Sequence, residues 1–334
     1  MRNPLPYLDF LEQELQLSPI EATAPLVVDL FAGCGGLALG FEAAGFRTIG
    51  YEKLADPCAT YQHNLHGVCH QTTLTRQPDL VDGVDVIIGG PPCQPFSVGG
   101  HQRGLKDSRD GFPIFLDAVK SYRPQIALFE NVRGMLFRNK TYFEEIVSAL
   151  RELGYIVEWD ILNAADYGVP QRRERLFCVA HRGRWKWHPK THLNSPYTVG
   201  EALGELALIA PSNAKFLTPS MDEYIKKYER ASKCVRPRDL HIDAPSRTVT
   251  CRNFSAPTGD MLRLRLPDGR RRRLTVREGA RLQSFPDWFE FKGNQESQCN
   301  QIGNAVPPIL AKALANSVKV YLQKCTEPKR LVSQ

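Results

Sequence analysis

LVVDLFAGCGG, residues 26–36, decides the fold of this chain. Residues 26–31, which are apolar except for Asp29, predict the first strand, and residues 32–36 are the small residues of a tight turn. A helical stretch, 37–44, follows and ends at Gly45. Such a corner lets backbone N–H groups approach a nucleotide-like ligand. Its G-x-G-G spacing, unlike the G-x-G-x-x-G of dinucleotide sites, favours a nucleoside with an amino-acid tail over a diphosphate.

Strands and helices go on alternating until about residue 182. This alternation predicts an α/β fold with a doubly wound, mostly parallel sheet. A last helix is expected at 308–324, after QIGNAV. The further strands that we expect are 47–51, 84–88, 126–129, 155–162 and 176–180, and the helices between them are 56–65, 115–122 and 142–153.

Polar and reactive side chains follow several of these strands. Glu52 ends the second strand, the position that hydrogen-bonds ribose hydroxyls in this fold class. GGPPCQPFS, residues 89–97, follows the VDVII strand, and its prolines hold Cys93 on a stiff turn. Glu130 and Asn131 follow the IALF strand. The carboxyl ends of parallel strands share one edge, so we expect these groups at one site, although the Cys93 turn by itself is more typical of a buried, inert thiol.

A second, smaller domain is expected at 186–272. Tryptophans, prolines, helical fragments and short alternating stretches such as 247–251 and 262–266 replace the regular pattern there. Asp268–Gly269 predicts a hairpin turn. The remaining divisions that we expect are an N-terminal extension at 1–22 with an amphipathic helix (Leu8, Leu11 and Leu15 on one face), a large domain at 23–185, a connecting segment at 273–300, and a C-terminal segment at 301–334 that completes the large domain.

The composition excludes several classes of protein. Hydrophobic residues make up 42% and charged residues 24%, as in globular proteins. No apolar run is long enough to span a bilayer, and the N-terminus lacks the apolar core of a signal peptide, so we expect a cytoplasmic protein. The nine Cys are scattered without a C-x-x-C pair, which argues against disulfides and a zinc site, and no metal is expected.

The net charge of +7 is concentrated in one stripe. Residues 263–281 contain eight Arg against only Asp268 and Glu278. A local basic excess suits a polyanion such as nucleic acid. On charge alone, a solvated charged hairpin explains the stripe equally well.

The string of motifs resembles the cytosine-5 DNA methyltransferases, most closely the stand-alone bacterial enzymes of restriction–modification systems. The motifs occur in the family's order and span most of the chain outside 183–272. They are DLFAGCGG (29–36), GGPPCQPFS (89–97), ENVRGM (130–135), DYGVPQRRERLF (166–177), LTVREGARLQSFPDWF (274–289) and QIGNAVPP (301–308).

The resemblance implies covalent catalysis at a cytosine ring. Cys93 would add to ring carbon 6, which makes carbon 5 nucleophilic enough to accept a methyl group. Glu130 would hold or donate a proton at ring nitrogen 3, and Asn131 would order the site. Gln171, Arg173 and Arg175 alternate along QRRER and should point together. Arg173 and Arg175 match the family arginines that support the acid and the bound base, Arg175 being the stronger candidate.

The resemblance also implies S-adenosyl-L-methionine as the cofactor. One departure is HQTTLT at 70–75, where Thr73 stands in place of the family's adenine-binding acid. Phe31 would stack on adenine, and Glu52 would bind the ribose. The full set of expected cofactor residues is Phe31, Gly33, Gly35, Leu37, Glu52, Pro91, Asn304 and Val306.

The expected substrate is double-stranded DNA. A base inside a duplex is unreachable, so the target cytosine must be rotated out, and the glycine-bearing loop at 98–109 resembles the family's mobile loop. Thr248 and Val249 resemble the pair found in target-recognition regions, and Arg263, Arg265, Arg271 and Arg273 suit phosphates or guanine edges. We expect a monomer whose cognate endonuclease is a genetic partner only. RNA cytosine methylation, or a catalytically silent DNA-binding regulator, is the alternative.

Overall fold

The computed structural model describes residues 6–92, 110–183, 185–189, 191, 196–212, 214–233, 238–255 and 259–326. Cys93 and the loop at 98–109, both singled out by the sequence, lie outside these residues. No helix among the described residues is long and apolar enough to cross a membrane.

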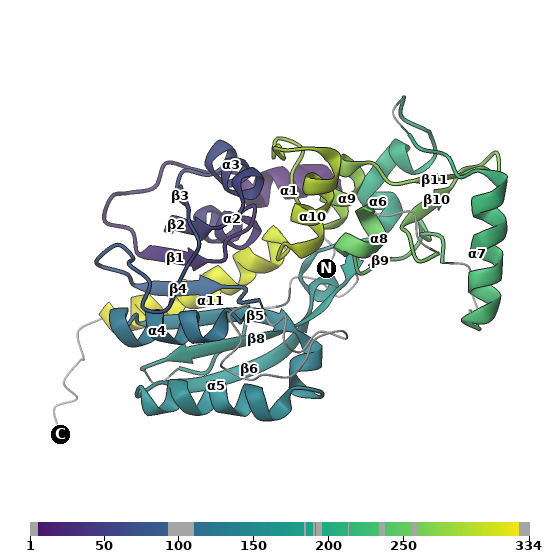
Figure 1. Ribbon diagram of the computed structural model, residues 1–334. Helices are drawn as coiled ribbons and strands as arrows, with labels where there is room; N and C mark the ends of the chain where they lie inside the picture. The colour runs from purple at the N-terminus through teal and green to yellow at the C-terminus, as the bar shows by residue number, and fades with distance from the viewer. Residues whose placement is uncertain are drawn as a thin grey trace, which may run out of the picture.

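A seven-stranded sheet in the order β3-β2-β1-β4-β5-β8-β6 forms the centre of the molecule (Figure 1). Every pairing from β3 to β5 is parallel, and β8 alone runs antiparallel to its neighbours β5 and β6, so the expected mostly parallel sheet is confirmed. Leu30, Tyr51, Gly89 and Phe129 lie at the same level, which brings four carboxyl ends to one edge. The strands are β1 (Leu26–Leu30), β2 (Arg47–Glu52), β3 (Val68–Gln71), β4 (Val86–Gly89), β5 (Ile126–Val132), β6 (Ile156–Asn163) and β8 (Glu174–His181).

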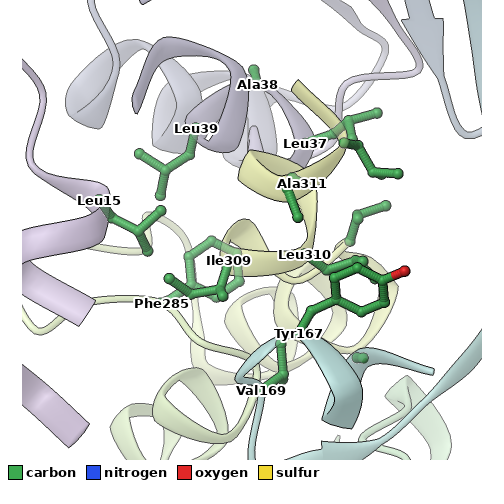
Figure 2. Packing of buried hydrophobic residues seen from close by; sticks show 14 of the residues in the cluster. Leu15, Leu37, Ala38, Leu39, Tyr167, Val169, Phe285, Ile309, Leu310 and Ala311 are labelled. Atoms are coloured by element: carbon green, nitrogen blue, oxygen red, sulfur yellow. The ribbon is translucent and has the colours of Figure 1, made fainter. Parts of the chain in front are cut away.

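Each face of the sheet is covered by its own helices. Side chains alternate across a strand, so Val27 of β1 joins one hydrophobic cluster and Val28 the other. Figure 2 shows part of the first cluster, where Leu37 and Leu39 face Ile309 and Leu310. The first cluster gathers α1 (Tyr7–Leu15), α2 (Gly36–Ala43), α3 (Ala55–Asn64) and α11 (Pro308–Thr326), and the second gathers α4 (Phe112–Tyr122) and α5 (Lys140–Glu152).

The two ends of the chain pack onto this body. In α1, Leu11 and Leu15 are fully buried, and Glu14 accepts a hydrogen bond from Lys312 of α11, so the expected N-terminal helix exists and contacts the large domain. Helix α11 crosses α2 so closely that a Cβ on Gly40 would lie 2.4 Å from the Cβ of Ala311. The C-terminal helix therefore returns to the sheet (Figure 1).

The remaining elements lie beside the carboxyl edge and extend away from it to α7 and a hairpin (Figure 1). Strand β10 pairs with β11, and Gly269 at the turn has φ +85°, which confirms the expected hairpin. These elements are β7 (Gln171–Arg172), β9 (Ser246–Arg247), β10 (Arg263–Arg265), β11 (Arg271–Arg273), α6 (Val199–Leu203), α7 (Pro219–Ala231), α8 (Cys251–Ser255), α9 (Val276–Leu282), α10 (Gln295–Asn304), and the 3₁₀ helices η3 (Arg133–Leu136), η4 (Ala164–Tyr167) and η5 (Gly204–Ala207).

The prediction of a strand at 247–251 is wrong. Strand β9 ends at Arg247, and helix α8 begins at Cys251. The Asn253 side chain accepts a hydrogen bond from the Thr250 N–H at 2.9 Å and donates one to the Thr248 carbonyl at 2.9 Å. These local side-chain bonds offer the backbone an alternative to a strand ladder, so they end the strand and start the helix.

Candidate active site

An ion pair lies at the carboxyl edge of the sheet. Glu130, near the end of β5, meets Arg175 of β8, with the guanidinium Nε 3.1 Å from the carboxylate Oε1. The two side chains are only 12% and 15% exposed. The antiparallel pairing of β5 with β8 brings these two side chains together, because Val132 of β5 lies opposite Arg175. A half-enclosed carboxyl held by a guanidinium can exchange hydrogen bonds and charge with a planar polar ligand.

Asn131 ties this pair to the proline turn. Its side chain is buried, and its Nδ2 donates to the Pro91 carbonyl at 3.0 Å. A Cβ on Gly90 would lie 3.8 Å from the Glu130 Oε2, so the turn passes directly beside the acid. The Gly111 N–H donates to the Pro92 carbonyl at 3.0 Å, which joins the chain on either side of 93–109. The segment that carries Cys93 thus leaves the described structure next to Glu130.

The glycine corner is held open by Glu52. The Glu52 carboxylate accepts hydrogen bonds from the N–H of Gly33 at 2.9 Å and of Leu54 at 2.8 Å. Gly33 has φ +55°, and a Cβ there would meet nothing within 4 Å. Gly35, at φ +86°, is instead closed in by Tyr61 and Leu65. The corner therefore combines a rigid floor with open space above Gly33.

Phe31 occupies a strained position between β1 and this corner. Its φ of +61° is rare for a bulky residue and indicates a conformation that the surroundings impose. The half-buried ring lies against Gly111, where a Cβ would come within 2.9 Å of it. An imposed strain of this kind is typical of ligand-binding positions.

The C-terminal residues approach the same corner. Val306 is buried, and its carbonyl lies 2.5 Å from where a Cβ on Gly36 would stand, so the first turn of α2 sits directly on this segment. Leu37, in the same turn, is 5% exposed. Asn304 is exposed at the end of α10, and its Oδ1 accepts a hydrogen bond from the Cys251 thiol at 2.9 Å.

Arg173 lies deeper than Arg175. Its side chain is 2% exposed, and its Nη1 donates to the carbonyls of Val249 at 2.9 Å and Gly303 at 3.3 Å. Burial, and next the positive charge of Arg175, lowers the pKa of the Arg173 guanidinium to about 9. Arg173 and Arg175 therefore occupy different surroundings, although they are two residues apart.

The arginine stripe is largely internal, which corrects the expectation of a free basic surface. Arg263 is fully buried, with its Nε 2.6 Å from Asp239 and its Nη2 2.6 Å from Glu229. Arg271 is 8% exposed and pairs with Asp239 and Asp222. The sequence did not reveal this, because the acids that neutralise Arg263 and Arg271 come from residues 222–239. Arg273 is half-buried and donates to the carbonyls of Phe254 and Ser255, and Arg265 is 53% exposed.

Thr248 and Val249 lie beside β7, the short strand that precedes Arg175 on the chain. Thr248 is partly exposed, and its hydroxyl donates to the Arg172 carbonyl at 2.8 Å. Val249 is fully buried. The structure thus brings the expected recognition pair next to the run that leads to Arg175.

Comparison with known proteins identifies the family. Residues 26–320 match the C-5 cytosine-specific DNA methylases. The chain belongs to this family. Type II methyltransferase M.AplI of Arthrospira platensis is 61% identical over 323 residues, 97% of this chain and 94% of the relative. Type II methyltransferase M1.HphI of Haemophilus parahaemolyticus is 36% identical and shares 87% of this chain and 86% of its own length.

Solved structures show the same fold. Entamoeba histolytica methyltransferase EhMeth superposes with a TM-score of 0.70 at 18% identity and covers 90% of this chain and 99% of its own. The Dnmt2 methyltransferase of Schizosaccharomyces pombe gives a TM-score of 0.68 at 17% identity and covers 91% of this chain and 100% of its own.

This protein is a DNA cytosine-5 methyltransferase that uses S-adenosyl-L-methionine.

The glycine corner fits that cofactor. Space above Gly33 admits a ligand against the backbone, and the first N–H groups of α2 suit its carboxylate, because they have no partner within the helix. The Glu52 carboxylate suits hydroxyl groups. When bound, the cofactor supplies an electrophilic methyl group on a positively charged sulfur.

Sequence reasoning missed Asp29, which lies beneath the corner on β1. Its side chain is 1% exposed, and its Oδ2 has no hydrogen-bond partner among the described residues. Burial, with a smaller effect from the charge of Glu52, raises the pKa of the Asp29 carboxyl to about 8. An acidic residue inside an otherwise apolar strand, LVVDL, was the available signal.

Proposed function

We propose that this methyltransferase acts on a cytosine rotated out of duplex DNA, with Cys93 as the nucleophile and Glu130, Arg175 and Asn131 around the ring. The observation that carries the proposal is the Glu130–Arg175 pair, which Asn131 holds against the proline turn two residues before Cys93. Cys93 lies outside the described residues, so its role rests on its place in PPCQ and on the chemistry that the reaction needs.

The proposed reaction follows from the reactivity of the ring. The Cys93 thiolate adds to carbon 6, a C–S bond forms, and the ring electrons move towards carbon 5 while Glu130 holds a proton at nitrogen 3. Carbon 5 would then take the methyl group as the bond between that methyl and the cofactor sulfur breaks, and S-adenosyl-L-homocysteine, a neutral thioether, would leave. Loss of the carbon 5 proton to a base or water and breaking of the C–S bond return the thiolate and leave 5-methylcytosine. Arg175 fixes the Glu130 carboxylate and contacts the base edge.

Around this centre we propose two binding regions. The cofactor would lie over Phe31, Gly33, Gly35 and Leu37, with Glu52 at the ribose, and with Pro91, Asn304 and Val306 completing the pocket. Thr248 and Arg265 would face the DNA, and the fully buried Val249 would hold Thr248 in place from the protein side. Arg263 and Arg271, which are neutralised internally, would shape the hairpin that presents Arg265.

The biological role that we propose is protection of host DNA in a restriction–modification system. Both relatives described above carry the name Type II methyltransferase, and the match to M.AplI covers 97% of this chain. We propose a cytoplasmic monomer whose cognate endonuclease is linked to it genetically rather than by contact.

The test is to map the product. The protein is incubated with methyl-labelled cofactor and, separately, with an unmethylated plasmid and with tRNA, and bisulfite sequencing then locates each methylated cytosine. We expect label in the plasmid alone, at one recurring sequence. Label in tRNA but not in the plasmid, or no transfer to any cytosine, would overturn the proposal.

A further inference from the structure

A buried polar junction joins the parts of the chain that the reaction needs. Its side chains are Gln171, Arg173 and Gln283, which are 0%, 2% and 0% exposed. Gln171 and Arg173 precede Arg175 on the chain, and Gln283 follows α9. Fully buried polar side chains are expensive unless each is bonded, so their bonds show what the junction holds in place.

On one side the junction holds the backbone of Val249 from both directions. The Val249 N–H donates to the Gln171 Oε1 at 2.9 Å, and the Val249 carbonyl accepts from the Arg173 Nη1 at 2.9 Å. Strand β9 pairs with β7 immediately before this point, with Ser246 opposite Gln171. Segment 246–249 is thereby fixed in register on the chain that leads to Arg175.

On the other side the junction holds the end of α10. Arg173 donates to the Gly303 carbonyl at 3.3 Å, and the Gln283 Nε2 donates to the Ile302 carbonyl at 2.6 Å. Gln171 closes the network, because its Nε2 donates to the Gln283 Oε1 at 2.8 Å. Asn304 and Val306, which we place at the cofactor, follow directly.

Arg173 is an unusual choice for filling this space. No carboxylate of the described residues lies within ion-pair distance of its guanidinium, and its Nε has no partner among them. Apolar side chains of similar volume fill a buried space at lower cost than an unpaired cation. What the guanidinium adds is a fixed bridge between the Val249 and Gly303 carbonyls.

We infer that Gln171 and Arg173 are positioning residues that hold segment 246–249, which leads into the proposed recognition pair, against the chain that leads to Arg175, so that sequence recognition and the reaction at Glu130–Arg175 depend on one another. This inference rests on the proposed function. It changes the role expected for Arg173, which acts through the two backbone carbonyls rather than on the base.

The experiment compares Arg173→Met, Gln171→Met, the double variant and Arg173→Lys with the wild-type protein. The control is Arg123→Met, which removes a guanidinium–carbonyl bond to Leu153 away from the junction. For each protein we measure kcat and KM on the mapped plasmid sequence, the share of methylation outside that sequence, and the Kd of S-adenosyl-L-methionine.

We expect both single Met variants to lower kcat roughly 10- to 100-fold, because each leaves a backbone group of Val249 buried and unpaired. The share of methylation outside the sequence should rise, the cofactor Kd should stay within about twofold, and Arg173→Lys should recover part of the rate. The effects should not be additive, because both side chains hold one residue. The Arg123→Met control should match the wild type.

The outcomes separate the inference from the function beneath it. A wild-type protein that methylates no cytosine refutes the proposed function, and the inference falls with it. An active wild type with folded Arg173→Met and Gln171→Met variants of unchanged rate and selectivity overturns the inference alone. If the Met variants fail to fold, the same measurements are made on Arg173→Lys and Gln171→Asn. Unchanged rate and selectivity in both of these variants overturn the inference.

Discussion

At the scale of single residues, the chemistry depends on the few residues that lie directly beside Glu130. Arg175 holds the carboxylate, and Asn131 and Gly90 bring the proline turn beside it. Glu130→Gln keeps the shape but removes the titratable proton. We expect single-turnover methyl transfer to slow about 10²- to 10⁴-fold with cofactor binding unchanged. Glu174→Gln, on an exposed side chain of the same strand region, is the control, and a Glu130→Gln rate within tenfold of it would refute the role.

Asp29 gives stability a pH dependence. Its pKa is about 8 in the folded protein and about 3.9 in an unfolded chain, so folding favours the protonated carboxyl. This contribution is complete below about pH 4 and is lost as pH rises to about 8, by up to about 1.4 kcal/mol per pH unit. In urea unfolding of the cofactor-free protein, Asp29→Asn should therefore gain stability over wild type from pH 5 to pH 8. A difference that stays constant between pH 5 and pH 8 would contradict this.

At the scale of elements, the contact between α2 and α11 sets the floor of the cofactor corner. A Cβ on Gly40 would lie 2.4 Å from the Lys312 nitrogen, so one helix must move if Gly40 changes. Gly40→Ala should lower the free energy of unfolding by about 1–3 kcal/mol, although Ala favours a helix by about 1 kcal/mol. Gly134→Ala, whose Cβ meets nothing within 4 Å, is the control in denaturant unfolding. Equal stability of the two variants would show that the contact is looser than described.

Sequence predicted these elements well where periodicity and turn chemistry agree. The glycine corner, the strand ends that deliver Glu52 and Glu130, and the Asp268–Gly269 hairpin all follow from local patterns. The strand predicted at 247–251 is wrong because the side chain of Asn253, two residues beyond it, hydrogen-bonds to the backbone of this segment. Its alternation gave no sign of that bond. The junction at Gln171 and Gln283 could not be predicted either, because its partners are 112 residues apart.

At the scale of the whole molecule, the net charge of +7 hides an internal balance. Arg263 and Arg271 of the β10–β11 hairpin pair with Asp239, Glu229 and Asp222, so local composition overstated the free basic surface. Arg263→Met leaves buried acids short of a partner and should cost about 3 kcal/mol or more of unfolding free energy. Arg265→Gln, on an exposed side chain, should cost under about 1 kcal/mol and instead weaken DNA binding and its salt dependence. Equal thermal stability of the two variants would contradict this division.

We propose that Cys93 attacks the cytosine ring, and trapping the resulting adduct is the sharpest test of that attack. Fluorine at carbon 5 replaces the proton that must leave, so the reaction stops after methyl transfer with the enzyme attached. A duplex with 5-fluorocytosine at the mapped position is mixed with S-adenosyl-L-methionine and with wild type or Cys93→Ser, and mass spectrometry follows the complex. We expect a covalent adduct on a peptide containing Cys93 in the wild type and none in Cys93→Ser. An adduct that persists in Cys93→Ser, or that maps to another residue, would contradict it.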